Sequence, residues 1–365
     1  MEEKNMENNN AYIIPTPILN AKEENSIDEL TKRYDKLCEP GAISVAKERL
    51  VKFIPDKVKK LSNNAKNLIT EQQLYTQAMD VILKGFKAVE EQASKFSISE
   101  NGIIDNINSV CKDNQISKIE EILLMRGYDI SKAVNRYKTK DFWTAFAEGA
   151  ITGAGGFWTL PFNIVLSTFL YYRAVQSIAM HYGYDVKNDS AELMIASEVF
   201  INALSPDSDS HSEMANLIGK IMLIGKAEAV KQTVKKGWTE MAAKGGTELF
   251  LTQIRALAHK SAQKALENAG KKGIENSIFK DIFAQVGRKL TQKVIARSIP
   301  VVSGIIGALF DSAQMQQVLD YADVFYNKRF LLEKEQRINM LVEGKECIFD
   351  VEYEESACDD EEDMN

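Results

Sequence analysis

The chain has little cysteine, histidine and proline, and each shortage narrows what the protein can be. Its 365 residues include four cysteines, three histidines and seven prolines. Cys38, Cys111, Cys347 and Cys358 show no Cys-x-x-Cys spacing and have no neighbouring histidine. This pattern argues against a zinc site and against a disulfide framework. We therefore expect no metal, no cofactor and a reducing, cytoplasmic environment.

Catalytic and targeting motifs are also missing. His181, His211 and His259 lie far apart, and none has the i, i+4 partner of a metalloprotease helix. No Gly-x-Ser-x-Gly elbow marks a nucleophile, and we expect His181 to pack at a helix end. The segment Gly219–Ala227 differs from a P-loop by one extra residue and by Ala227 in place of Ser or Thr. The acidic N-terminus lacks the features of a signal peptide. We expect a protein that is not an enzyme.

The residues that are abundant predict an all-α, multi-helix bundle. Lys, Glu, Ala, Ile and Leu dominate the chain and favour helix. Apolar residues recur at three- and four-residue steps between Leu61 and Phe86, whereas no strand-length alternation occurs. Capping boxes at Ser26–Glu29 and Ser117–Glu120 predict two helix starts. We expect four regions: a disordered arm (1–25), an N-terminal helical region (26–115), a second helical domain (116–337) and an acidic tail (338–365).

The most apolar stretch runs from residue 149 to residue 172 without a charge, in a chain that is 27% charged. Four glycines and Pro161 interrupt it, so it is not a clean transmembrane span, which needs about 20 predominantly apolar residues. We expect two helices that meet between Gly155 and Pro161 and form a hairpin. A second uncharged run covers 298–310. The residues expected to build these glycine-rich apolar hairpins are Gly149, Gly153, Gly155, Gly156, Phe157, Trp158, Pro161, Pro300, Gly304 and Gly307, with Arg173 directly after the first run.

Two interpretations of the hairpins remain open. In one, they insert into lipid or lie against it, with Phe157 and Trp158 at the interface and Arg173 reaching lipid phosphates. In the other, glycine lets the helices pack closely inside a soluble bundle. Arg173 would then form a salt bridge with Asp185 or Glu192. We expect Asp185 to cap or end its helix.

Charge is distributed unevenly along the chain. Residues 220–297 carry sixteen Lys/Arg against six Asp/Glu, whereas residues 341–365 carry eleven Asp/Glu and one Lys. The first segment suggests an anionic partner and the second an interaction or solubility tail. A solvated helix face with an acidic tail would give the same pattern. The candidates for a basic face are Lys231, Lys235, Lys236, Lys271 and Lys272.

Two stretches contain the residues of a known family pattern. In the first stretch these are Gly149, Ala150, Thr152, Gly153, Gly155, Gly156, Thr159, Leu160, Pro161, Arg173, Ala174, Gln176, Ile178, Ala179, Tyr182, Gly183, Tyr184 and Asp185. In the second they are Ile299, Pro300, Val301, Val302, Gly304, Ile306, Gly307, Ala308, Ala322 and Phe325. Over about 120–335 the chain therefore resembles the EcsC protein family, bacterial proteins named for a gene beside an ABC exporter.

This resemblance implies an all-helical fold and a link to membrane processes such as export or envelope stress. It implies no established enzymatic activity. Where family members often carry Pro-x-Asp after the glycines, this chain has Asn163, which puts any role of that acid in doubt here. Residues 1–115 look like a separate addition.

The sequence therefore predicts a non-enzymatic protein of the cytoplasm, peripheral to the inner face of the cell membrane. It would dock on anionic lipid, or on a membrane protein complex, through its basic helices and apolar hairpins. The alternative is a soluble helical scaffold or regulator that binds a protein partner, with both uncharged runs in its core. The pI of about 5.3 argues against nucleic acid as the partner of the whole chain.

Overall fold

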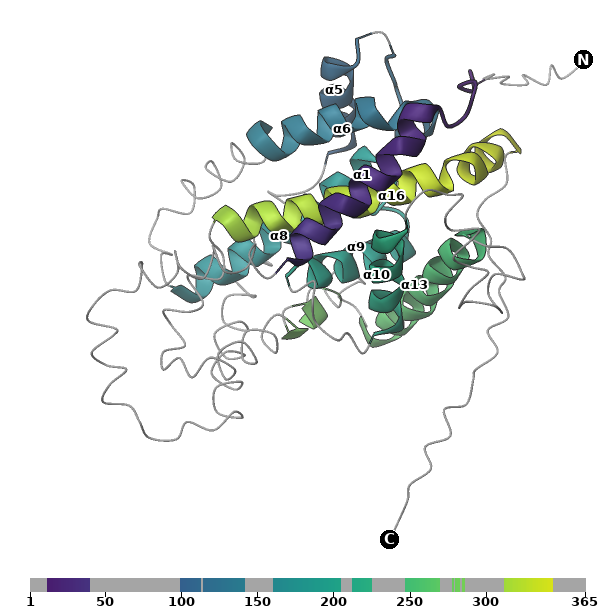
Figure 1. Cartoon of the computed structure of the whole chain (residues 1–365). Coiled ribbons are helices and arrows are strands. Elements are labelled where there is room, and N and C mark those ends of the chain that lie inside the picture. The colour runs from purple at the N-terminus through teal and green to yellow at the C-terminus, as the bar shows by residue number, and fades with distance from the viewer. Residues whose placement is uncertain are drawn as a thin grey trace, which may run out of the picture.

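The computed structural model describes residues 12–39, 99–112, 114–141, 160–204, 212–224, 247–269, 278, 280–282, 284–285 and 312–343. Its helices, drawn in Figure 1, are α1 (Ala21–Cys38), α5 (Glu100–Val110), η2 (Ile119–Leu124), α6 (Gly127–Arg136), η3 (Tyr137–Asp141), α8 (Leu160–His181), α9 (Ser190–Ala203), α10 (Glu213–Leu223), α13 (Thr247–Ala269) and α16 (Ser312–Glu343). No strand occurs in these residues, so the predicted all-α, multi-helix fold is confirmed.

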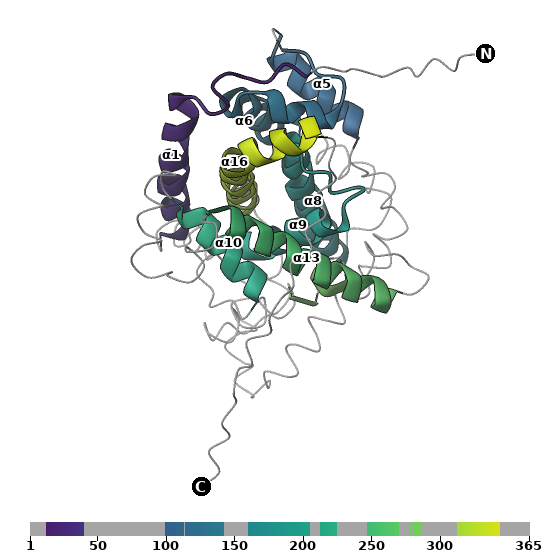
Figure 2. The same ribbon diagram turned by 90° about the vertical axis from the view of Figure 1, so that its right-hand side faces the viewer.

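Helix α16 is the axis of the structure. Figure 2 looks along the bundle and shows α16 in the middle, with α1, α10, α9, α8 and α6 around it. Phe325, Phe330 and Ile338 of α16 are completely buried in the shared apolar core. The same helix also buries charged side chains, namely Asp323, Lys328, Arg329, Glu333 and Lys334. Because buried charges are costly unless they are paired, the neighbouring helices must supply partners for them.

The first helix begins six residues earlier than the Ser26–Glu29 box predicts. Asn20 is the N-cap of α1: its side chain accepts a hydrogen bond from the Glu23 backbone N–H at 3.0 Å, and the Glu23 side chain accepts one from the Asn20 backbone N–H at 3.2 Å. Ser26 lies inside the helix and donates to the Lys22 carbonyl. An asparagine cap with glutamate at the third position satisfies the first free amides as well as a serine box does. Residues 21–25, expected in the arm, are therefore helical.

The Ser117–Glu120 box is displaced by one residue. Glu121 is the acceptor, and it takes hydrogen bonds from the backbone N–H groups of Ser117 (2.6 Å) and Lys118 (3.3 Å). The segment that follows is the short 3-10 helix η2, and α6 starts only at Gly127.

The second half of the first uncharged run lies in helix α8, which begins at Leu160 and continues to His181. Pro161 lies in its first turn, where the missing N–H of proline removes no helical hydrogen bond. Phe169, Tyr171 and Tyr172 are buried in the apolar core, so this end of the run packs against protein. Among the described residues, no helix combines the length and the apolar character needed to cross a bilayer.

Most of the candidate surface residues fall outside the part of the chain that the structure describes. These are Gly149, Gly153, Gly155, Gly156, Phe157, Trp158, Pro300, Gly304 and Gly307 of the hairpins, and Lys231, Lys235, Lys236, Lys271 and Lys272 of the basic face. The backbone of Pro161 and the whole of Arg173 are described.

Candidate functional site

The turn Tyr182–Asp185 joins α8 to α9 and shapes the candidate site. The Gly183 N–H donates to the Met180 carbonyl at 2.9 Å, and the Tyr184 N–H donates to the Ala179 carbonyl at 3.1 Å. This pair of bonds is a Schellman motif, which places the residue after the cap in the left-handed region. Gly183 has φ of +74° and is that residue. His181, the last residue of α8, is buried, which confirms its predicted place at a helix end.

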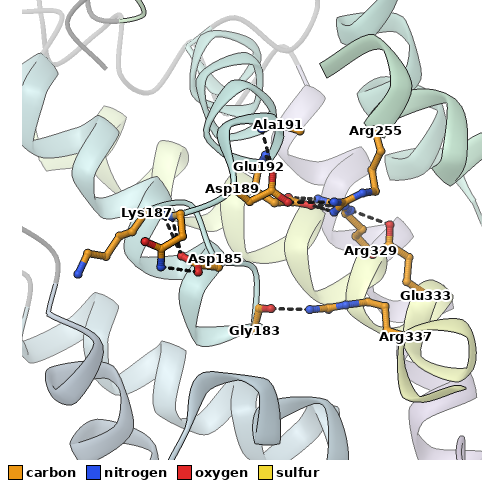
Figure 3. Close-up of polar contacts among 11 residues, drawn as sticks. Gly183, Asp185, Lys187, Asp189, Ala191, Glu192, Arg255, Arg329, Glu333 and Arg337 are labelled. Atoms are coloured by element: carbon orange, nitrogen blue, oxygen red, sulfur yellow. Dashed lines mark hydrogen bonds and ion pairs between the residues drawn. The ribbon is translucent and has the colours of Figure 1, made fainter. Parts of the chain in front are cut away.

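The turn positions Glu192 at the centre of a buried ion-pair cluster (Figure 3). Asp189 caps α9 by accepting the backbone N–H groups of Ala191 and Glu192, which brings Glu192 into the first turn. Arg329 of α16 then binds Glu192 through two parallel hydrogen bonds of 2.6 and 2.9 Å. Arg255 of α13 binds the same carboxylate and also Asp189, at 2.9 Å. One carboxylate thus joins α9, α13 and α16.

Tyr184 extends this cluster toward the turn. Its hydroxyl donates to Glu333 at 2.9 Å, and Glu333 also accepts from Arg329 Nε at 2.8 Å. The guanidinium groups of Arg329 and Arg337 each lie 4.1 Å from the centre of the Tyr184 ring. Arg337 donates to the carbonyls of Gly183 and Tyr182, so it neutralises the end of α8.

Charge in the cluster is balanced. Three arginines (255, 329 and 337) face three carboxylates (189, 192 and 333). Burial alone would raise the pKa of Glu192, but the guanidiniums of Arg329 and Arg255 lower it to about 2. A carboxylate with such a pKa stays ionised near neutrality and is a poor general acid or base, because efficient proton transfer needs a pKa near the working pH. The arrangement holds helices together and presents charge.

A cavity of about 720 Å³ opens beside the cluster. Its polar walls come from the α8–α9 turn, from α13 and from α16, and its apolar walls include Leu123 and Met340. The charged and polar residues that line it are Glu120, Tyr184, Asp185, Asn188, Asp189, Ser190, Glu192, Arg255, His259 and Arg337. Its volume would suit a small polar ligand.

Arg173 does not form the expected salt bridge. It donates to Gln176 at 2.8 Å and stacks over the Phe169 ring, whereas Glu192 is bound by Arg255 and Arg329. Asp185 accepts from the backbone N–H groups of Lys187 and Asn188. It therefore shapes the turn that follows α8, and Asp189 caps the next helix. The expected pairing failed because α16 brings Arg329 to Glu192, and sequence separation gave no sign of that contact.

The sequence did not identify Arg255, Arg329, Arg337 or Glu333 as members of the ion-pair cluster, although it contains one signal for a buried charged helix. In 320–337 of the last helix, charged residues occur at nearly every turn on all sides, as Asp320, Asp323, Lys328, Arg329, Glu333, Lys334 and Arg337. Such a helix has no continuous apolar face and needs ion-pair partners if it lies in the core. The residues Tyr182, Gly183 and Tyr184 were identified as part of the family pattern, and Asp185 was also expected at the end of its helix.

In the part of the chain that the structure describes, the protein is an all-helical bundle whose central helix, α16, is joined to its neighbours by buried ion pairs. The chain belongs to the EcsC protein family, whose family model matches residues 42–331. This match reaches further toward the N-terminus than the motifs, which lie in 149–185 and 299–325. It therefore includes most of the region 1–115 that looked like a separate addition. Neither a curated protein nor a solved structure matches the chain.

Replacing Gly183 by alanine should destabilise the fold by about 1–2 kcal/mol, because a side chain at positive φ is strained. Space is not the obstacle, since the nearest atom to an added Cβ is 3.4 Å away. The matched control is Gly219→Ala on α10, where an added Cβ meets nothing within 4 Å. It should stabilise the protein by about 0.5–1 kcal/mol. Urea unfolding measures both, and equal effects at the two positions would contradict the assignment.

Proposed function

We propose that the protein is a non-enzymatic, membrane-associated EcsC protein that docks on anionic lipid from the cytoplasmic side and assists a membrane process such as export or the response to envelope stress. Its lipid contacts would be the two uncharged runs and the Lys/Arg-rich residues 220–297. The soluble scaffold that binds a protein partner is the competing function, and it is favoured by the burial of Phe169, Tyr171 and Tyr172 in the protein core.

One observation carries the proposal. The two uncharged runs are more than a hundred residues apart, yet they lead into helices that begin at the same end of the bundle. Residues 149–172 run into α8, which begins at Leu160, and residues 298–310 precede α16, which begins at Ser312. These two helices pack against each other, and both start at the left end in Figure 1. Apolar segments attached at one end of a helical body could meet a bilayer together.

The positive charge of residues 220–297 also supports docking on an anionic leaflet. Each Lys or Arg near such a surface contributes about 1 kcal/mol of attraction. In the described part of this segment, Lys260, Lys264 and Lys280 have exposed side chains. The neutralised cluster around Glu192 supports a non-enzymatic role, because its carboxylate is held ionised between two arginines.

Co-sedimentation with vesicles tests the proposal. The full chain should sediment with phosphatidylglycerol-containing vesicles and not with phosphatidylcholine alone. Part of this binding should persist at high salt, because apolar contacts are not screened. Reversing Lys231, Lys235 and Lys236 to Glu should weaken binding by at least about a hundredfold.

The matched control reverses three exposed lysines elsewhere, Lys32, Lys36 and Lys118, and should leave vesicle binding nearly unchanged. A chain that remains in the supernatant with every vesicle would contradict membrane docking. The protein-binding scaffold would then be the better account.

A further inference from the structure

A site that binds a carboxylate lies between α1, α6 and α16, and Glu23 of α1 occupies it. One oxygen of Glu23 accepts from Lys334 Nζ at 2.7 Å and from the Gly127 backbone N–H at 2.9 Å. The other accepts from Arg126 Nη1 at 2.9 Å. Gly127 is the first residue of α6, so its N–H is one of the free amides at a helix start and adds the positive end of the helix dipole. Two cations and an amide thus converge on one anionic group.

Two of the three donors also bind backbone carbonyl groups. Lys334 is completely buried and also donates to the Met125 carbonyl at 2.8 Å. Arg126 also donates to the Pro17 and Ile18 carbonyls. Burial would raise the pKa of Glu23, but the hydrogen bonds from Lys334 and Gly127 outweigh it and bring the pKa below its usual range. The site is therefore selective for a negatively charged group.

Helix α1 supplies Glu23, whereas α6, the residue before it and α16 supply the three donors. The family match covers residues 42–331, so Arg126 and Gly127 lie inside it, whereas α1 lies before it and Lys334 lies just after it. The apolar contact of α1 is one narrow stripe of buried side chains, Ile27, Leu30 and Tyr34. A segment with few buried apolar groups opens at a lower free energy than the whole fold.

Further along α1, the contacts with α16 are polar. Arg33 pairs with Asp323 at 2.9 Å, and Lys328 donates to Thr31 at 2.9 Å. Polar contacts of this kind can be exchanged for contacts with water or with another polar partner. Helix α1 is thus held by polar side-chain pairs as well as by its apolar stripe.

One side of the occupied site borders a cavity, which Glu23 and Gly127 line and Arg126 and Lys334 do not. A cavity of about 230 Å³ lies under α1, between it and α6 and α16. Both Glu23 and Gly127 line this cavity, together with polar side chains that include Ser26, Ser131 and Asn327. A small anion that enters there would meet the carboxylate of Glu23 and the amide that binds it.

We propose that Arg126, Gly127 and Lys334 form a binding site for the anionic oxygens of a phosphate group, and that Glu23 occupies the site until such a group displaces α1. The phosphate can be free or can belong to a lipid headgroup. The site itself does not depend on membrane docking.

Hydrogen–deuterium exchange of the full chain, followed on peptides that cover α1, tests the proposal. Glu23→Gln keeps the shape of the occupant but removes its charge, and Glu24→Gln removes a charge from the exposed neighbouring residue. We expect α1 to exchange at least about tenfold faster in Glu23→Gln than in Glu24→Gln, because hydrogen bonds to a charged group are the stronger ones. Inorganic phosphate should accelerate exchange of α1 further, and it should bind Glu23→Gln at least about tenfold more tightly than wild type. Adding Lys334→Met to Glu23→Gln should abolish the phosphate effect.

Two results would overturn the proposal: equal exchange of α1 in the two glutamine variants, or a phosphate effect that survives Lys334→Met. Circular dichroism of each variant checks that the remaining helices are folded. A parallel arm with phosphatidylglycerol vesicles separates the sources of phosphate. If vesicles accelerate exchange of α1 as phosphate does, the headgroup is a ligand. If phosphate acts and vesicles do not bind, the anion site stands and membrane docking fails. Vesicles that bind while neither they nor phosphate alter α1 would contradict the anion site alone.

Discussion

Replacing Glu192 by leucine will destabilise the protein by about 3–5 kcal/mol, because it removes the carboxylate that accepts two hydrogen bonds from a buried arginine and leaves that arginine with Glu333. Arg329 is completely buried and donates two hydrogen bonds to Glu192. Arg255 loses the same carboxylate. Urea unfolding of the purified variant measures the change. The matched control is Glu335→Leu, an exposed glutamate on α16, which should change stability by less than about 0.5 kcal/mol.

A double-mutant cycle separates the ion pair from a general packing defect. Arg329→Met should also be strongly destabilising, since it leaves Glu192 and Glu333 short of a partner. The double variant should cost clearly less than the sum of the two single variants, because neither charge then remains buried alone. Additive costs would show that the two groups do not stabilise each other.

Acid titration gives an independent check on Glu192. Its pKa is about 2 in the folded protein and 4.5 as the reference value, so the unfolded chain binds the proton more tightly. The stability contributed by this group is complete above about pH 4.5 and is lost as the pH falls toward 2. Its size is about 3 kcal/mol, from about 1.4 kcal/mol per pKa unit. Glu192→Leu should lack this part of the acid dependence.

Replacing Lys328 by methionine will stabilise the protein at pH 6, by about 1–3 kcal/mol, and the gain will disappear as the pH rises. The Lys328 ammonium is completely buried, and its hydrogen bonds go to Thr31 and to the Met222 carbonyl. Burial lowers the pKa of Lys328 to about 7, although the negative charges of Asp35 and Asp28 offset part of this decrease.

The direction of this pH dependence follows from proton uptake. Between about pH 7 and 10.5 the unfolded chain keeps the proton that the folded chain has released. Wild-type stability should therefore rise with pH across that window, and the variant should lack the rise. Lys334→Met is the matched control on the same helix. It should be destabilising, because Lys334 is paired with Glu23. A Lys328→Met variant that is less stable than wild type at pH 6 would contradict this account.

Composition was enough to predict the helical class, because no strand pattern competes with it. Local chemistry also placed His181 at a helix end. The predicted N-cap of the first helix was wrong by six residues, since asparagine and serine cap helices about equally well and both were present with a glutamate three residues later.

The ion-pair cluster could not be predicted from the sequence, and the reason is physical. Glu192 and Arg329 are 137 residues apart, so their contact depends on how α9 packs against α16. The sequence gives the number of charges in the last helix but not which of them are buried. The salt bridge expected for Arg173 failed for the same reason. Whether the uncharged residues before Leu160 contact lipid stays a prediction, because those residues lie outside the described range.

The most direct test of membrane docking is the fluorescence of Trp158 in the presence of vesicles. The chain has three tryptophans, so Trp143→Phe with Trp238→Phe leaves Trp158 as the only emitter, within the first uncharged run. The account predicts a blue shift on anionic vesicles and quenching by lipids brominated along their acyl chains. Emission that is unchanged by every vesicle, in a protein with intact helical circular dichroism, would contradict the account and place Trp158 away from lipid.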